Sequence, residues 1–447
     1  MAIPTEILPH YCALEDFFRL ANIEMQNEGT PKKAFALVAL DFDNFNFIND
    51  LFSYEVGDQV LTQITRYFSR QLKDGELYTR MGADHFVFFV AGSSSLIERF
   101  VEISNAKNVL ARILPAHYTL SYSGGIVLLK DREENFSALL DKANFARKQA
   151  KGRDANTFYY YDEKMDQELQ WKKSVTFMME SALQHEEFQM YLQPKVLMKT
   201  GQPVGAEALA RWKSREFGLI YPDRFIPILE QNGLIRQLDF LILRQACAFL
   251  ENCMGTDLPP LPISVNFSKM HIYTPDFPEK VLRTVKEYHI PTCLIEIEFT
   301  ENIFLPNSQN LIKISEALKQ LGFKVALDDF GSAYSSLNYL KDLPLDVIKI
   351  DRGFLNATEN NDKGRVIIEK VVDLIQSLRL IALMEGVESQ EQADFLQKLN
   401  CDLAQGYFFA RPMPLPDYME YLKHSSPITD IDDYFSTHQK NVCAATR

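Results

Sequence analysis

Short apolar runs alternate with longer amphipathic stretches in the first third of the chain. Val60, Leu61, Ile64 and Phe68 recur at helical spacing. Two apolar runs flank the Gly82-Ala83-Asp84 turn and predict a β-hairpin over 76–92. The other expected strands cover 34–43, 118–129 and 157–162, and the expected helices cover 56–72, 96–114 and 136–151. This order predicts an α+β sheet domain at 34–164, after an N-terminal helical segment at 1–33.

Strands and helices alternate from Phe188 onward. The expected strands cover 189–197, 205–211, 262–267, 294–300, 324–329, 347–351, 380–387 and 404–409. Helical stretches lie between most of them, at 223–252, 308–323, 365–378 and 389–399. About eight strands with helices in roughly 250 residues predict an α/β fold, a (β/α)8 TIM-like barrel, at 174–424. We expect a connecting helix at 165–173 and a polar C-terminal tail at 425–447 that is ordered only in part.

Polar side chains recur at the carboxyl ends of these strands, where barrels of this kind carry their functional groups. They are Glu207, Asn266, Glu298, Asp328, Asp329, Lys349, Glu385 and Gln405. Solvation alone would not require one on nearly every strand, so we expect them to converge. Taken singly, an acid pair such as Asp328-Asp329 also serves as a helix cap or a loop edge. Lys349 lies inside an apolar strand and needs a carboxylate neighbour, for which Asp328 and Asp329 are the candidates.

Converging carboxylates raise one another's pKa, and divalent cations relieve that repulsion. Oxygen ligands without histidine or cysteine favour Mg²⁺ or Mn²⁺ over zinc. Two such ions about 3.5–4 Å apart are a common arrangement for phosphodiester hydrolysis. The sequence therefore predicts a two-metal site, in which Lys349 holds the attacking water or stabilises developing charge.

Composition narrows the range of functions. The 447 residues carry a formal net charge of -13, which argues against binding a nucleic acid polymer. The six cysteines are scattered without paired spacing, so we expect neither a zinc motif nor a disulfide framework, and a reducing cytoplasmic setting. The N-terminus lacks the pattern of a signal peptide, and no apolar run approaches about 18 residues. We therefore expect a soluble chain without a membrane segment.

The second half resembles the EAL domain family of cyclic di-GMP phosphodiesterases. The matching motifs, in family order, are Glu207-Ala208-Leu209-Ala210-Arg211, Asn266-Phe267-Ser268, Glu298-Phe299-Thr300-Glu301, Asp328-Asp329-Phe330-Gly331, Lys349-Ile350-Asp351, Glu385-Gly386-Val387-Glu388 and Gln405-Gly406-Tyr407. The resemblance implies that Glu207, Asn266, Glu298 and Asp328 hold a first metal and that Asp328 and Asp329 reach a second. It implies Glu385 as general base and Lys349 as the group that positions water. It assigns Arg211, Glu388 and Gln405 to the substrate, and Glu301 to holding the loop 330–336.

Three of these residues also have simpler interpretations. Asn266 could cap a turn, Arg211 could form a surface ion pair, and Glu388 could cap the helix that begins near Ser389.

The first half resembles the GGDEF domain family of diguanylate cyclases. The resemblance is carried by the strand Leu40-Asp41-Phe42-Asp43-Asn44-Phe45, by Ile48-Asn49-Asp50, by Gly57-Asp58 and by the hairpin. The family's hairpin motif is Gly-Gly-Asp-Glu-Phe, and here it is Gly82-Ala83-Asp84-His85-Phe86. His85 replaces a metal-binding glutamate, and Ala83 adds a methyl group where the backbone would approach the nucleotide. Asn46 replaces a family lysine, and the family's product-binding motif is here Lys73-Asp74-Gly75-Glu76.

Three functional hypotheses follow from the two resemblances. The first is a metal-dependent enzyme that opens cyclic di-GMP to linear pGpG, with a catalytically inactive GGDEF domain as a regulatory module. The second is a barrel that binds cyclic di-GMP and signals without turnover. The third, a bifunctional cyclase and hydrolase, is disfavoured by His85. Since Asp41 and the sheet frame persist, GTP binding at the first half remains open, and the pairing common among such barrels implies a homodimer.

Overall fold

The computed structural model describes residues 8–26, 35–82, 84–105, 107–111, 113–115, 118, 120–129, 135–151, 156–301, 304–331, 340–356 and 362–428. Ala83 and residues 332–336 of the predicted loop lie outside these ranges, as does the tail from residue 429. The chain divides into two compact units between Ser174 and Val175. The helix α7 (Glu163–Gln184) begins in the first unit and ends in the second.

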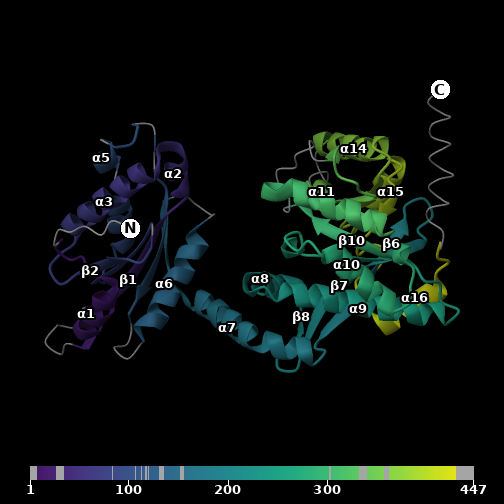
Figure 1. Ribbon diagram of the computed structural model, residues 1–447, viewed down its shortest axis with the longest axis horizontal. Helices are drawn as coiled ribbons and strands as arrows, with labels where there is room; N and C mark the ends of the chain where they lie inside the picture. Colours follow the sequence, from purple (N-terminus) through teal and green to yellow (C-terminus); the bar gives the residue numbers. More distant parts are fainter. Residues whose placement is uncertain are drawn as a thin grey trace. The chain divides into compact units, whose positions relative to one another are not determined.

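The first unit is a five-stranded sheet with helices on both faces (Figure 1). Its strands are β1 (Phe35–Phe42), β2 (Leu77–Arg80), β3 (His85–Ala91), β4 (Tyr122–Leu128) and β5 (Thr157–Tyr160), in the order β2-β3-β1-β4-β5. Its helices are α1 (Leu14–Gln26), α2 (Asn46–Phe52), α3 (Tyr54–Gln71), α4 (Leu96–Ser104), α5 (Lys107–Leu110) and α6 (Phe136–Ala150). Among the described strands of this unit, β4 and β5 pair in parallel and the other pairs are antiparallel, which fits the predicted α+β class.

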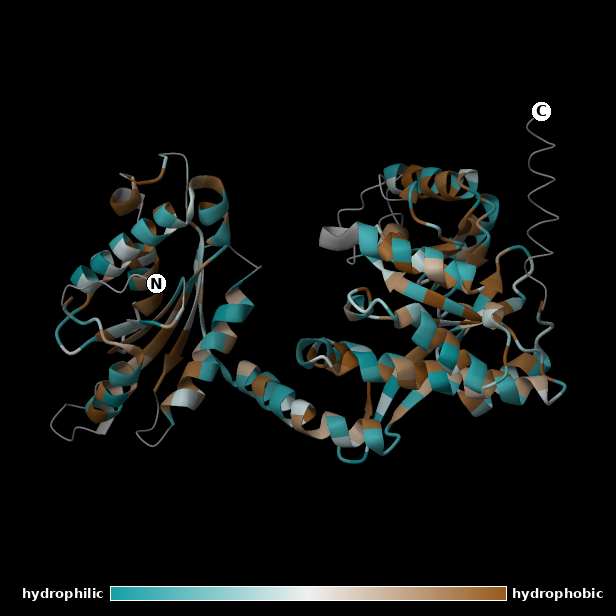
Figure 2. Cartoon of the chain, in the orientation of Figure 1, coloured by the Kyte–Doolittle hydropathy of each residue, from teal (hydrophilic) through white to brown (hydrophobic). Residues whose placement is uncertain are grey.

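Successive side chains of β1 point to opposite faces of the sheet and pack into two separate hydrophobic cores. Val38 and Leu40 face α3 and α4, whereas Leu37 and Ala39 face α1 and α6. Figure 2 shows the hydrophobic strands between the helices. The single helix predicted at 96–114 is wrong, because the backbone leaves helical geometry at Asn105 and separates α4 from α5.

The second unit is a closed barrel of eight strands. In barrel order they are β6 (Phe188–Leu197), β7 (Pro203–Ser214), β9 (Ile263–Asn266), β10 (Ile295–Thr300), β11 (Lys324–Phe330), β12 (Val347–Ile350), β13 (Ile381–Met384) and β14 (Leu403–Ala404). Two short strands, β8 (Gly218–Ile220) and β15 (Met413–Pro414), extend the sheet beside β7 and β6.

Helices surround the barrel (Figure 1). They are α8 (Pro222–Asn232), α9 (Ile235–Met254), η1 (Lys269–His271), α10 (Phe277–Glu287), η2 (Thr292–Leu294), α11 (Phe304–Gln320), α13 (Gly353–Asn356), α14 (Asp362–Ser377), α15 (Gln390–Lys398) and α16 (Leu415–His424). The expected helix at 223–252 is divided into α8 and α9, because Gly233 adopts the left-handed conformation that ends α8.

The barrel departs from an all-parallel (β/α)8 arrangement at its first strand. β6 runs antiparallel to both of its neighbours, β7 and β14, and a tight turn at Thr200-Gly201 joins it to β7 without a helix. The expected strand at 404–409 is shortened to two residues, since the chain bends at Gly406 against the backbone of Val387.

A small apolar cluster fills one end of the barrel. It consists of Leu197, Val204, Ala326, Val347, Leu383 and Leu403. Within this cluster Ala326, Val347 and Leu383 each come two residues before a polar side chain of the same strand or strand end. The polar groups of β11, β12 and β13 therefore lie toward the carboxyl ends of those strands.

Candidate active site

A buried ammonium group is surrounded by carboxylates inside the barrel. The Nζ atom of Lys349, which is 0% exposed, lies 2.8 Å from Glu385 Oε1, 2.9 Å from Glu298 Oε2, 2.9 Å from Asp328 Oδ1 and 3.2 Å from Glu207 Oε2. The four acids come from four different strands or strand ends, β13, β10, β11 and β7. The expected convergence of polar strand ends is therefore present, and Lys349 has four acidic neighbours rather than the one predicted.

Carboxylate oxygens gather into two overlapping groups. Glu207, Glu298 and Asp328 each offer an oxygen within 4.8 Å of the others, and so do Asp328, Asp329 and Glu385. Asp328 belongs to both groups. All of these donor atoms are carboxylate oxygens, which suit a hard divalent cation.

A backbone irregularity brings both aspartates to the same site. On a regular strand, Asp328 and Asp329 would point to opposite faces. The pairing of β11 with β12 shifts register between Leu327 and Phe330, and Asp329 has a φ of 57°. Asp328 Oδ1 also accepts a hydrogen bond of 3.0 Å from the Asp329 N–H. The bulge turns Asp329 back toward Asp328, so one strand end supplies two carboxylates to the same acidic group.

A second buried lysine, Lys195, also binds Glu298. Lys195 Nζ lies 2.8 Å from Glu298 Oε1 and 2.7 Å from Glu296 Oε1. Lys349 binds the other oxygen of Glu298, so both of its carboxylate oxygens are paired. Burial alone would raise the pKa of Glu298, but Lys195 and Lys349 lower it to about 2. Glu298 is therefore held in place as an ionised carboxylate.

Two amide side chains donate hydrogen bonds to Glu207, and a third amide binds one of them. Asn266 Nδ2 donates to Glu207 Oε1 over 2.7 Å, and Gln405 Nε2 donates to Glu207 Oε2 over 2.7 Å. Gln405 Nε2 also donates to Gln193 Oε1 over 2.9 Å. The Oε1 atom of Gln405 is buried without a hydrogen-bond partner in the part of the chain that the structure describes. The site thus holds an unsatisfied acceptor beside its acids.

Burial raises the pKa of the remaining acids despite the cation among them. It raises that of Asp328 to about 7 and that of Glu385 to about 7, against the opposing effect of Lys349. Burial also raises the pKa values of Glu207 and Asp329. For Lys349, burial is outweighed by its acidic neighbours, chiefly Asp328 and Glu207, and its pKa is raised. Two carboxyl groups near neutrality are suited to exchanging protons.

Three predicted residues lie apart from the acidic groups. Arg211 is 7% exposed, donates to the Ala210 carbonyl over 2.8 Å and packs against the rings of Tyr191 and Tyr221. Its ion-pair interpretation finds no support among the described residues.

Glu301 accepts a hydrogen bond from the Gly331 N–H over 2.7 Å, at the start of the predicted loop. The Glu388 side chain is exposed and makes no hydrogen bond or ion pair with any described residue. The helix cap that Glu388 could have provided is formed by Ser389 and Gln392 instead.

Sequence reasoning missed Gln193, Lys195 and Glu296. Gln193 and Lys195 are two positions apart on β6, and Glu296 is two positions before Glu298 on β10. All three side chains are buried inside the barrel. The argument used for Lys349, that a lysine within a buried strand needs an acid, applies equally to Lys195. Its partner Glu296 precedes Glu298 by two positions and thus shares its face.

The hairpin of the first unit lies beside an acid that is already neutralised. Asp41 is directly opposite His85 in the β1–β3 pairing. Its carboxylate binds Arg147 Nη1 at 2.5 Å and Lys151 Nζ at 3.3 Å. The described residues group no third acid with Asp41 and Asp43 into a candidate metal cluster.

His85 is largely buried, and burial lowers its pKa to about 4. Its Nε2 atom has no hydrogen-bond partner among the described residues. Asp84 has a pKa raised by burial and by Asp41, Phe86 lies in the core, and the Gly82 carbonyl accepts from Arg80. A neutral imidazole therefore stands where the family has a carboxylate.

The motif residues around this hairpin serve packing and ion pairing. A Cβ on Gly57 would meet Asn49 Oδ1 at 2.0 Å, so the two motif segments are in direct contact. Glu76, in the segment 73–76, is buried and binds Arg99 through both oxygens, at 2.7 and 2.6 Å.

Two family models match the chain. The EAL domain model covers residues 178–412, and the model described as diguanylate cyclase, GGDEF domain covers residues 15–157. The second match begins at residue 15, within α1. None of the described helices is long and apolar enough to cross a membrane.

Curated relatives share this order of domains over most of the chain. Cyclic di-GMP phosphodiesterase NbdA of Pseudomonas aeruginosa is 31% identical over 401 residues, 88% of this chain and 50% of NbdA. Bifunctional diguanylate cyclase/cyclic di-GMP phosphodiesterase MucR of the same species is 29% identical over 412 residues, 91% of this chain and 59% of MucR. The chain thus spans about half the length of the curated relatives it matches.

Solved structures agree with the fold. The PaMucR phosphodiesterase in complex with c-di-GMP is 33% identical, with a TM-score of 0.53, and the match covers 55% of this chain and 99% of that one. The S helix-GGDEF-EAL structure of Vibrio cholerae LapD covers 90% of this chain and 95% of its own at a TM-score of 0.57, but at 18% identity it supports the fold alone.

Proposed function

Because the chain belongs to the EAL domain family, with a GGDEF domain ahead of the barrel, we propose that it hydrolyses cyclic di-GMP to linear pGpG. The observation that carries the proposal is the pair of acidic groups joined at Asp328. Such a pair fits two divalent cations and a phosphodiester between them. The names of NbdA and of the PaMucR complex supply the substrate class.

We assign Glu207, Asn266, Glu298 and Asp328 to one cation and Asp328 and Asp329 to its neighbour, and we leave Glu385 outside the ligand set. When bound, Mg²⁺ or Mn²⁺ ions would favour ionisation of a water nucleophile and neutralise the phosphodiester. Lys195 keeps Glu298 ionised and in place. Glu301 fixes Gly331, and with it the start of the loop after β11.

We assign proton transfer to Glu385. The pKa of its carboxyl group is near 7, so it can accept a proton from the attacking water at neutral pH. Lys349 Nζ, 2.8 Å from Glu385 Oε1, orients the carboxylate and stabilises negative charge as the water oxygen bonds to phosphorus. The ester bond to one 3′ oxygen breaks, that oxygen takes up a proton, and the product keeps a 5′ phosphate. Arg211, Gln405 and Glu388 are the proposed substrate contacts.

Hydrolysis is tested by incubating the full chain with cyclic di-GMP and Mg²⁺ and separating the products. We expect pGpG, its loss with excess chelator, and a fall of orders of magnitude in Glu207→Ala. Glu279→Ala, an exposed acid on α10, is the matched control. Undiminished turnover in chelator would refute the two-metal site. Tight binding of cyclic di-GMP without product would leave the barrel a binding module.

We propose that the GGDEF domain does not synthesise cyclic di-GMP. Arg147 and Lys151 already neutralise Asp41, and His85 offers a neutral imidazole where a second acid would be needed. GTP binding to this domain, with an effect on the barrel, stays a separate proposal. Incubating Glu207→Ala with GTP and Mg²⁺ tests synthesis without loss of product by hydrolysis, and any cyclic di-GMP formed would contradict it. A flat hydrolysis rate up to millimolar GTP would exclude regulation by GTP.

We also propose a homodimer, supported by the exposed apolar side chains of α14. Val366 and Ile367 there are 54% and 51% exposed. Sedimentation of the parent and of Val366→Asp with Ile367→Asp tests this, and equal molecular masses would contradict it.

A further inference from the structure

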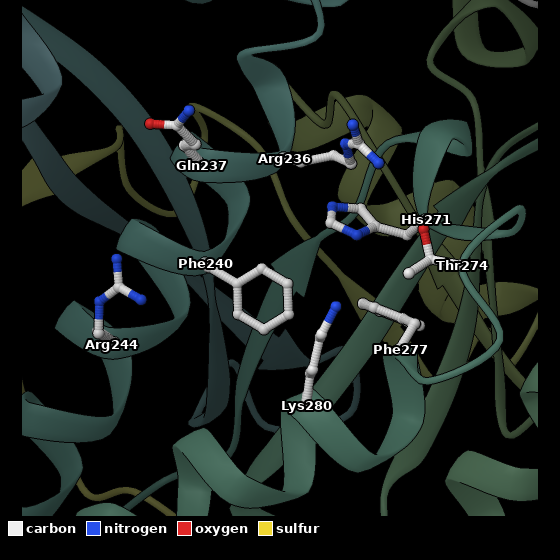
Figure 3. A pocket seen from close by; sticks show the side chains of 8 residues that line it. All are labelled: Arg236, Gln237, Phe240, Arg244, His271, Thr274, Phe277 and Lys280. Carbon is white, nitrogen blue, oxygen red and sulfur yellow. The ribbon is translucent and has the colours of Figure 1, made fainter. Parts of the chain in front are cut away.

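A pocket separate from the acidic site lies between α9, η1 and α10. It has a volume of about 430 Å³, within the range of small-molecule sites. Cationic and aromatic side chains dominate its lining: Arg236, Arg244 and Lys280, with Phe240, His271 and Phe277 (Figure 3). The lining contains no acid and none of the residues assigned to hydrolysis.

Two of the three cations have no anionic partner. Arg236 and Arg244 are exposed and form no hydrogen bond or ion pair with any residue that the structure describes. Lys280 pairs with the exposed Asp276 at 3.0 Å. Such a concentration of positive charge is unusual on a chain with a formal net charge of -13. It favours an anionic ligand.

A buried histidine forms part of the wall. His271 is 2% exposed, and its Nε2 atom lies 2.9 Å from Asp239 Oδ2. The same Asp239 oxygen accepts the Ser268 N–H over 3.0 Å. Nδ1 of His271 has no partner among the residues described here. Asp239 therefore fixes the ring and leaves Nδ1 as the nitrogen that can hydrogen-bond a ligand.

Aromatic rings form the base of the pocket. The centroids of Phe240 and His271 are 5.5 Å apart, and those of His271 and Phe277 are 4.8 Å apart. Figure 3 shows Arg236 and Lys280 extending toward these rings from opposite sides, with Arg244 beyond Phe240. Phe240 is only partly buried, so its ring can contact a ligand.

We propose that this pocket binds a small phosphate ester carrying an aromatic ring, with a nucleoside monophosphate as the simplest example. The arginines would bind phosphate oxygens, for which their planar, bidentate groups are suited. Phe240 would pack against the base, and His271 Nδ1 would hydrogen-bond the ligand. Neither the acidic groups of the barrel nor the cations assigned to them take part.

The test is calorimetric titration of GMP into the full chain in the presence of chelator. Without metal, the acidic barrel site repels phosphate, and the outcome does not depend on hydrolysis. We expect Arg236→Ala with Arg244→Ala to weaken GMP binding at least tenfold, and Phe240→Leu to weaken it severalfold. Arg283→Ala, an exposed arginine of α10 outside the pocket, should leave the affinity unchanged. All four positions are exposed or only partly buried, so these variants should fold.

Guanosine and inorganic phosphate separate the two halves of the proposal. Each should bind at least tenfold more weakly than GMP. If inorganic phosphate bound as tightly as GMP, the base would contribute nothing to binding and the proposed contact with Phe240 would be wrong. Absence of GMP binding at millimolar concentration would overturn it, as would an affinity that the paired arginine change leaves intact.

Discussion

Lys195→Met should destabilise the barrel strongly and weaken its metal binding. The substitution keeps an unbranched side chain but removes the ammonium that binds Glu296 at 2.7 Å and Glu298 at 2.8 Å. Lys195 is 5% exposed, so water cannot replace these contacts without a change in packing. Glu298 would keep only Lys349, and the paired oxygen of Glu296 would have no cation.

The size of the effect follows from the burial of the partners. Removing one member of a buried ion pair costs about 3–5 kcal/mol, because the remaining charge stays out of water. For a unit of this size, about 2 °C of melting temperature corresponds to each kcal/mol, which gives a fall of about 6–10 °C. Metal affinity should fall by about 10–100-fold, as when other residues that orient a ligand are lost.

The assay is thermal unfolding in chelator, followed by Mn²⁺ titration monitored by electron paramagnetic resonance. Lys319→Met is the matched control, since Lys319 binds Asp346 at 2.6 Å but is 33% exposed. The control should cost less than about 1 kcal/mol. Lys195→Met with Glu296→Gln removes the unpaired charge and should regain part of the stability. Equal costs for the two single lysine variants, with unchanged Mn²⁺ affinity, would refute the role of Lys195.

Three further predictions concern other parts of the chain. Excess Mg²⁺ should stabilise the parent barrel by about 2.7 kcal/mol at a hundred times its dissociation constant, and Asp328→Ala should abolish the shift because Asp328 belongs to both acidic groups. Arg99→Met should lower the free energy of unfolding of the first unit by about 3 kcal/mol, because the Glu76 carboxylate would stay buried without its cation. Urea unfolding measures this, and a loss below about 1 kcal/mol would contradict the prediction. Burial raises the pKa of Asp402 from 3.8 to about 6, so the folded protein binds this proton more tightly than the unfolded chain and stability falls as pH rises through that window. In Asp402→Asn this contribution, about 3 kcal/mol, is absent, so the stability of the variant relative to the parent should rise between pH 4 and pH 6, and a constant difference would count against it.

The barrel and most of its acidic site could be predicted from the sequence. Period-two and helical patterns located the strands, and the position of acids at strand ends indicated which side chains would meet. Lys349 was predictable because a lysine in an apolar strand demands an acid. Lys195 is likewise a lysine within an apolar strand. Its partner Glu296 was not predicted because it lies two residues before Glu298, away from the carboxyl end of β10.

Long-range pairing limited the remaining predictions. The antiparallel direction of β6 follows from the short turn at Thr200-Gly201 and from closure against β14, and no local pattern specifies that closure. Arg147 binds Asp41 across 106 positions of the chain, so the neutralised acid of the first unit became visible only in the fold. The pocket between α9 and α10 likewise combines residues of separate elements that have no shared motif.

The backbone conformation of Asp329 restricts which amino acids this position can accept. With a φ of 57°, most side chains would cost about 1–2 kcal/mol, whereas glycine, asparagine and aspartate tolerate the conformation. Glycine would remove the carboxylate and asparagine its charge, while glutamate would retain the charge but strain the chain. If Asp329 holds a cation as proposed, only aspartate meets both demands, and any single substitution at this position loses either the charge or the relaxed backbone.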